Sequence, residues 1–160
     1  MTFSLALIYL ATWSLVGAAG FSIIVLYLFR SGKVYDARTE EGHLKADMPW
    51  KGILNMILFL GLIVATLTLS NVLTLVPRAA DLDFWMVFLL NLILITILIV
   101  YDSLVIDWWI IGHWRPAFLQ LPGEMNKEQM AKHIRRTILV APPLAILLSA
   151  LSGILTTLIW

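Results

Sequence analysis

Two carboxylates stand at the edge of a long apolar segment, in the stretch YDSLVIDWW. Asp102 and Asp107 are followed by His113 and Arg115 in the same part of the chain. A carboxylate next to lipid can carry a proton or hold a cation, and histidine can exchange a proton near neutral pH. Arginine can pair with a carboxylate or hold a phosphate. These four side chains are therefore the candidate functional or ion-pairing residues.

Helical geometry separates the two carboxylates. In an α-helix, a residue five positions further on points about 140° away, so Asp102 and Asp107 do not form a facing pair. Asn91 does share a face with Asp102, because eleven residues make almost three turns. We expect the carboxylates to converge on one ion only if the helix unwinds near Ser103 or a second helix contributes.

Asp102 and Asp107 differ in their expected depth in the membrane. Counted from Asp83, Asp102 lies roughly 28 Å along the helix, at the edge of the hydrocarbon. A carboxylate there costs a few kcal/mol unless it is paired, hydrated or protonated. We interpret Asp102 first as part of a structural ion pair and second as a proton- or cation-linked site, whereas Asp107, beside Trp108, is interfacial. Expected partners of Asp102 are Arg30, Lys51, Arg115, Arg136 and the hydroxyls of Tyr27 and Tyr101.

Motifs for catalysis, metal binding and cofactors are missing from the sequence. The chain contains no cysteine, and its three histidines, His43, His113 and His133, fall outside the apolar segments. We find no HExxH, GxSxG or glycine-rich phosphate motif. The sequence predicts no catalytic residue, no metal site and no cofactor, although a cytoplasmic-face site built from the four candidate residues stays open.

The composition is typical of an integral membrane protein. Hydrophobic residues make up 61% of the 160 residues and charged residues only 13%, about half the charged fraction of soluble domains. Since about 20 apolar residues cross the hydrocarbon as a helix, we predict a single transmembrane domain over 1–160. Its fold is an all-α four-helix bundle with spans at about 3–29, 52–76, 84–106 and 137–160, and a short interfacial helix at about 127–135.

Positive charges predict the orientation. The connections 30–51 and 107–136 each hold five Lys or Arg residues, whereas the short connection between the second and third spans holds only Arg78. Because such residues concentrate in cytoplasmic loops, both termini are expected outside the cytoplasm, in a prokaryotic plasma membrane. The net charge of +1 argues against a nucleic-acid partner.

Small residues recur every four positions in two spans. Such stripes let helix backbones approach closely, so we expect them to be packing seams within the monomer or between subunits. In the fourth span, Pro142 and Pro143 remove two backbone donors, which predicts a kink or break. The stripes comprise Ser14, Ala18 and Ser22 in the first span, and Ala145, Ser149, Gly153 and Thr157 in the fourth.

Amide and hydroxyl side chains are also found inside the spans. Asn55 and Thr66 share a face of the second span by the same eleven-residue rule. Asn91 in the third span is expected to hydrogen-bond to either of them across helices. Lining of a polar cavity is the alternative use of these residues.

The last third of the chain resembles a group of small uncharacterised prokaryotic four-helix membrane proteins. The resemblance covers an Asp–Asp helix end at Asp102 and Asp107, the turn Pro122-Gly123, and His133 with Arg135. It implies a shared fold and no mechanism.

Three functions fit these features. The first is a non-enzymatic accessory or scaffold subunit, packed in the bilayer against other membrane subunits or a second copy of itself. The second is a small proton- or cation-linked transporter or channel that uses Asp102. The third is a membrane-embedded enzyme that modifies lipids or isoprenoids at the cytoplasmic face.

Overall fold

The computed structural model describes residues 2–30, 50–79, 82–119 and 127–160, and these described residues contain no strand. Each of four segments is long and apolar enough to cross a membrane: Phe3–Tyr27, Ile57–Thr74, Phe84–Trp114 and Thr137–Ile159. A helix satisfies all its interior backbone hydrogen bonds within the segment, as hydrocarbon requires. The predicted all-α bundle of four spanning helices is thereby confirmed. The helical elements are α1 (Phe3–Arg30), α3 (Trp50–Thr74), α4 (Phe84–Tyr101), the π-helix η1 (Asp102–Trp114), the 3₁₀ turn η2 (Ala117–Leu119) and α5 (Lys127–Ile159).

Two elements differ from the expected ones. The third span does not end near residue 106 but continues as the π-helix η1 to Trp114. The expected interfacial helix and fourth span are one helix, α5, which contains both Pro142 and Pro143 and is not broken by them. In an α-helix, the N–H groups that proline lacks would donate to the carbonyls four residues earlier. For Pro142 and Pro143 these carbonyls lie close to the start of the fourth span.

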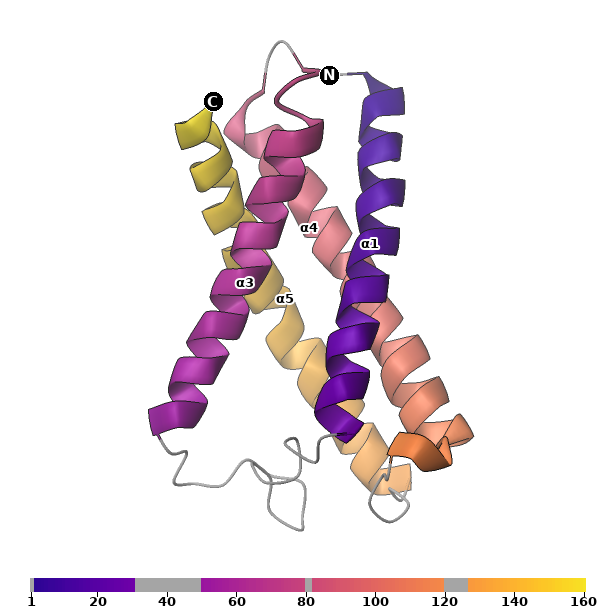
Figure 1. Cartoon of the computed structure of the whole chain (residues 1–160). Coiled ribbons are helices and arrows are strands. Elements are labelled where there is room, and N and C mark those ends of the chain that lie inside the picture. Colours follow the sequence, from indigo (N-terminus) through magenta and orange to yellow (C-terminus); the bar gives the residue numbers. More distant parts are fainter. Residues whose placement is uncertain (1, 31–49, 80–81, 120–126) are drawn as a thin grey trace.

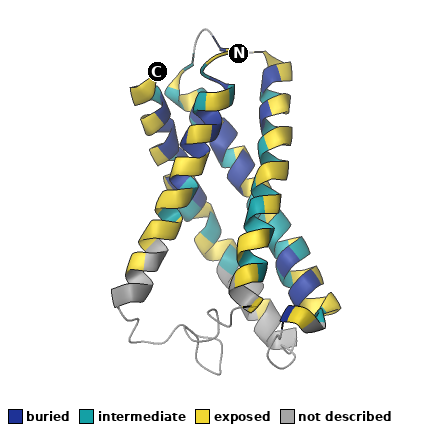
Figure 2. Ribbon diagram, in the orientation of Figure 1, coloured by how far each residue is buried: buried dark blue, intermediate teal, exposed yellow. Residues whose placement is uncertain are grey.

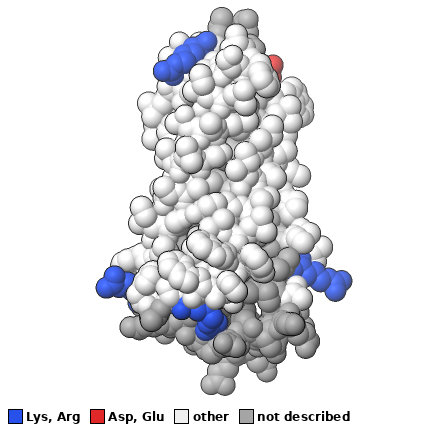
Figure 3. All heavy atoms as spheres, turned by 90° about the vertical axis from the view of Figure 1, so that its right-hand side faces the viewer, with Lys and Arg blue, Asp and Glu red and all other residues white. Residues whose placement is uncertain are grey.

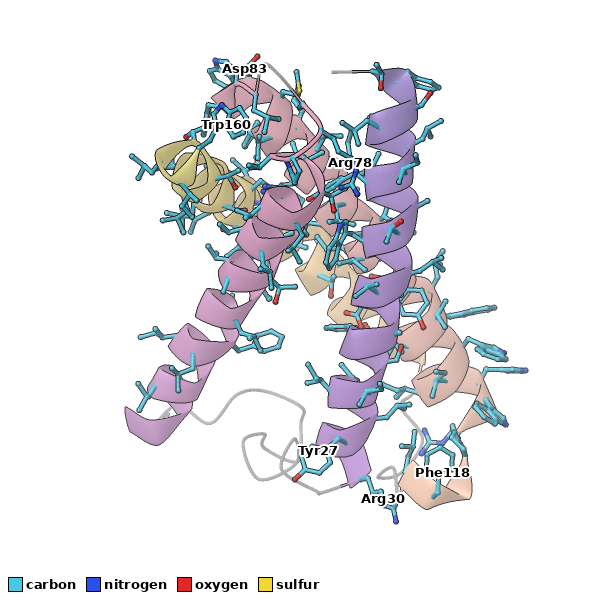
Figure 4. The ribbon with its side chains drawn as sticks, turned by 45° about the horizontal axis from the view of Figure 1, so that its top comes forward. Tyr27, Arg30, Arg78, Asp83, Phe118 and Trp160 are labelled. Atoms are coloured by element: carbon cyan, nitrogen blue, oxygen red, sulfur yellow. The ribbon has the colours of Figure 1, made fainter. Side chains whose placement is uncertain are left out.

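The helices alternate in direction, so both chain termini lie at one end of the bundle (Figure 1). We call this the terminal end; Arg78, Asp83 and Trp160 lie there, whereas Arg30 and Phe118 lie at the opposite end (Figure 4). We call the opposite end the basic end. The side of the membrane that each end faces remains a prediction.

Packing is tightest around α4, which contacts both α5 and α1, while α3 packs mainly against α5. Figure 2 shows buried residues on the upper parts of α4 and α5 and again low on η1. A first apolar cluster includes Leu67, Leu94 and Leu148, and a second, at the basic end, includes Ile106 and Leu119. Toward the basic end, α3 diverges from α1 (Figure 1). The bundle is therefore closed at the terminal end and splayed at the other.

Candidate functional site

The predicted carboxylates lie in the π-helix. Asp102 is its first residue, and both Asp102 and Asp107 are half-buried. Because a π-helix joins residue i to residue i+5, its wider turn brings these two residues nearer to one face than an α-helix does. The separation expected from α-helical geometry therefore does not apply. The helix widens close to Ser103, where an unwinding was one of the two expected routes to convergence of the carboxylates.

His113 and Arg115 close the same element. His113 is exposed in its last turn. Arg115 is half-buried and has φ 44°, in the left-handed region, and its backbone N–H donates to the Ile110 carbonyl at 2.8 Å. A left-handed residue commonly terminates a helix, so Arg115 ends η1 through its backbone. Among the described residues, no group of three or more His, Cys, Asp or Glu side chains could hold a metal ion.

Tyr101, an expected partner of Asp102, contacts α1 instead through its hydroxyl. That hydroxyl lies 2.9 Å from the Ser22 hydroxyl, and Ser22 donates its own hydrogen to the Ala18 carbonyl at 2.7 Å. Tyr101 is therefore the donor to Ser22. The contact joins α1 to α4 one residue before the π-helix begins.

The two small-residue stripes lie as follows. On α1, Ser14, Ala18 and Ser22 are all half-buried, and the neighbouring Gly17 faces Leu98 of α4. On α5, Ala145, Ser149 and Gly153 are buried and Thr157 is half-buried. Gly153 lies against Phe84 of α4, whose ring would be only 3.1 Å from an added Cβ. Each stripe, or a glycine next to it, therefore packs against α4 of the same chain.

Among the described residues, the most extensive polar cluster lies elsewhere, buried near the terminal end. The Tyr9 hydroxyl of α1 lies 2.7 Å from Asn71 Oδ1 and 3.0 Å from Ser70 Oγ, both on α3, and 2.9 Å from Asn91 Oδ1 on α4. These four residues are at most 1% exposed. We call this cluster, with Thr68, Ser152 and Thr156, the polar network.

The network reaches α5 through the two amides. Asn71 Nδ2 donates to Thr156 Oγ1 at 3.0 Å and to Ser152 Oγ at 3.3 Å. Asn91 Nδ2 donates to the same Ser152 oxygen at 3.1 Å. Side chains of all four spans are therefore joined in one hydrogen-bonded cluster. A buried network with partners for its polar groups rigidifies a core.

The number of hydroxyl hydrogens available in the polar network shows that its acceptors depend on one donor. Ser70 donates its hydrogen to the Leu67 carbonyl at 2.7 Å, so it can only accept from Tyr9. Tyr9 has one hydroxyl hydrogen and three oxygen neighbours. The two asparagine oxygens and Ser70 therefore compete for one donor, and loss of that donor affects α3 and α4 together.

Sequence reasoning missed this set of partners. Asn91 was expected to bond to Asn55 or Thr66, but it bonds to Tyr9 and Ser152. Thr66 is exposed and donates to the Leu62 carbonyl of its own helix, and the Asn55 side chain lies outside the described residues. The depth of these polar residues along their helices could have predicted that they meet. Tyr9, Asn71, Asn91 and Ser152 all lie within about two turns (~10 Å) of a helix end at the terminal end.

Comparisons with protein-family models, curated proteins and solved structures give no match to this chain.

Proposed function

We propose that this small membrane protein is a non-enzymatic accessory or scaffold subunit, which associates through α3 with another membrane helix, in a prokaryotic plasma membrane with the basic end in the cytoplasm. The partner helix comes from a different subunit or from a second copy of the chain. The resemblance to small prokaryotic four-helix membrane proteins is compatible with this proposal.

One observation carries the proposal: among its described side chains, α3 has a stretch in which no residue is buried. From Ile57 to Leu62, six consecutive residues, none is buried. Six residues cover more than one full turn. Only Leu60 among them is half-buried, against the first apolar cluster, and the other five are exposed. From Val64 to Asn71, by contrast, the helix is held by the apolar core and the polar network.

The uncovered part of α3 also has the residues that close helix contacts need. Gly61 has no atom within 4 Å of the position of an added Cβ, and Ala65, four residues on, is exposed. Small residues at this spacing allow a neighbouring backbone to approach closely. Leu58 and Leu62, both exposed, lie on the same face and supply side chains to interdigitate.

Cysteine cross-linking in native membranes tests this function, because the chain has no cysteine of its own. Leu58→Cys is placed on the uncovered part of α3, and Leu147→Cys, with similar exposure (61% against 54%), serves as the control on α5. We expect a cross-linked product from Leu58→Cys only. Its mass distinguishes a second copy from a different subunit, and absence of any product with Leu58→Cys overturns the proposal.

A second candidate function, proton- or cation-linked transport, rests on the π-helix. π-helical turns are frequent at functional sites, and this one begins at Asp102 and includes Asp107. Ion flux into proteoliposomes tests it. Transport predicts that Asp102→Asn abolishes flux while Asp107→Asn reduces it less, and absence of flux in the native chain excludes this function.

A further inference from the structure

Two arginines lie just beyond the apolar spans at the basic end. The first span ends at Tyr27, three residues before Arg30, and the third ends at Trp114, directly before Arg115. Residues at such positions lie at the level of lipid headgroups. Arg30 is exposed and Arg115 is half-buried.

Packing of η2 against α1 brings these two arginines to one region. Leu119 of η2 is fully buried in the apolar cluster that includes Val25 and Leu26 of α1. η2 follows Arg115 by one residue, and Arg30 lies with Phe118 of η2 at the basic end (Figure 4). Arg30 and Arg115 therefore come from separate spans, and both lie near this short turn, Arg115 along the chain and Arg30 through the packing of α1 against η2.

Exposed aromatic rings precede and follow Arg115 in the chain. The rings of Trp109 and Trp114 are stacked, with centroids 5.7 Å apart and planes at 21°, and both are exposed, as is Phe118. We call Arg30, Trp109, Trp114, Arg115 and Phe118 the arginine–aromatic surface. Tryptophan favours the membrane interface because its ring is apolar and its N–H can bond to headgroups.

The described charged side chains that are visible at this end carry one sign. In Figure 3, the only charged atoms to be seen among the described residues at the lower end belong to Lys or Arg. The carboxylates of the neighbouring π-helix, Asp102 and Asp107, belong to half-buried residues. On this face, described Lys and Arg side chains are thus exposed at the level expected for an anionic headgroup.

We propose that the arginine–aromatic surface binds the headgroup of an anionic phospholipid such as phosphatidylglycerol. A guanidinium group matches phosphate oxygens in a bidentate manner, and the stacked tryptophans cover the glycerol region beside it. A zwitterionic headgroup carries its own cation, which two arginines repel. This inference does not depend on the proposed subunit function.

Native mass spectrometry of the full chain in detergent tests the proposal, with phosphatidylglycerol and phosphatidylcholine of identical acyl chains as probes. We expect selective retention of phosphatidylglycerol. Arg30→Gln and Arg115→Gln should each weaken that binding about fivefold, since Gln keeps a polar side chain and the backbone hydrogen bonds but loses the charge. Arg78→Gln, at the terminal end, is the matched control and should leave it unchanged.

A second measurement needs no arginine variant. Brominated phosphatidylglycerol in vesicles should quench tryptophan fluorescence more than brominated phosphatidylcholine at equal mole fraction, and the difference should disappear in Trp109→Phe/Trp114→Phe. Equal retention and equal quenching by the two lipids overturn the proposal. The proposal is equally overturned if the double variant Arg30→Gln/Arg115→Gln keeps its lipid preference. It is also overturned if the substitutions release a bound protein chain from the complex and leave lipid binding unchanged.

Discussion

Tyr9 couples three helices through one hydroxyl group. Its oxygen contacts Ser70 and Asn71 of α3 and Asn91 of α4. Without that hydroxyl, the two amide oxygens lose their shared donor in a buried site where water does not replace it. An unsatisfied buried acceptor carries a desolvation cost beyond the lost bond.

Tyr9→Phe should therefore destabilise the bundle. Hydrogen bonds between membrane helices contribute roughly 0.6–2 kcal/mol, and we expect a loss of about 1 kcal/mol in the free energy of unfolding. Steric trapping or detergent-titrated unfolding measures it. Thr66→Val is the control, because Thr66 is exposed and bonds only to its own helix; equal stability of the Tyr9→Phe and Thr66→Val variants would contradict a structural role for the network.

Gly153 of α5 and Gly61 of α3 differ in the space around them. At Gly153 of α5, an added Cβ would lie 3.1 Å from Phe84 Cε2. The Phe84 ring is itself held between Phe88, stacked at 5.9 Å, and Trp85, edge-on at 5.2 Å. It therefore has little room to shift. At Gly61 of α3, nothing lies within 4 Å.

Gly153→Ala should loosen the α4–α5 contact and lower stability by about 1–3 kcal/mol, the usual cost of overpacking. Gly61→Ala should leave the monomer as stable or slightly more stable, because alanine favours helix over glycine. Unfolding measurements on the two variants separate the cases. If a partner helix packs on α3, Gly61→Ala should also reduce the cross-linking from Leu58→Cys, and a destabilised Gly61→Ala monomer would show that α3 is covered within the chain.

The third span illustrates how an element departs from its hydropathy pattern. Its apolar run and the Asp83 cap, which accepts a hydrogen bond from the Met86 N–H at 2.9 Å, define where α4 begins. The change from α- to π-helix at Asp102 has no comparable marker, because the side-chain pattern of an apolar helix does not record whether its backbone bonds reach four or five residues. The angle expected between Asp102 and Asp107 was consequently derived from the geometry of the wrong kind of helix.

At the scale of the whole molecule, both termini and Arg78 lie at one end and Arg30 at the other. Single cysteines in the cysteine-free chain can report which side each end faces. Thr2→Cys should react with an impermeant maleimide added to intact cells, whereas Phe118→Cys should react only after the membrane is opened. The reason is the excess of Lys and Arg in the two connections at the basic end. The reverse labelling pattern would invert the predicted topology.

What the sequence determined by itself was the number, approximate position and helical nature of the spans. Hydrophobicity and internal backbone hydrogen bonding are properties of each segment alone, so they can be read without knowing its neighbours. The stripes at Ser14–Ser22 and Ala145–Thr157 could likewise be recognised, though not the helix that each one contacts.

Tertiary structure alone decided which polar groups meet. Asn91 has its partners on α1 and α5 because the helices converge at the terminal end, and no spacing along one helix specifies the rotation of another. The same convergence leaves residues 57–62 of α3 without a buried residue among them and brings Arg30 near the turn that follows Arg115. Interactions between helices depend on their relative rotation, depth and tilt, which arise only when all four pack together.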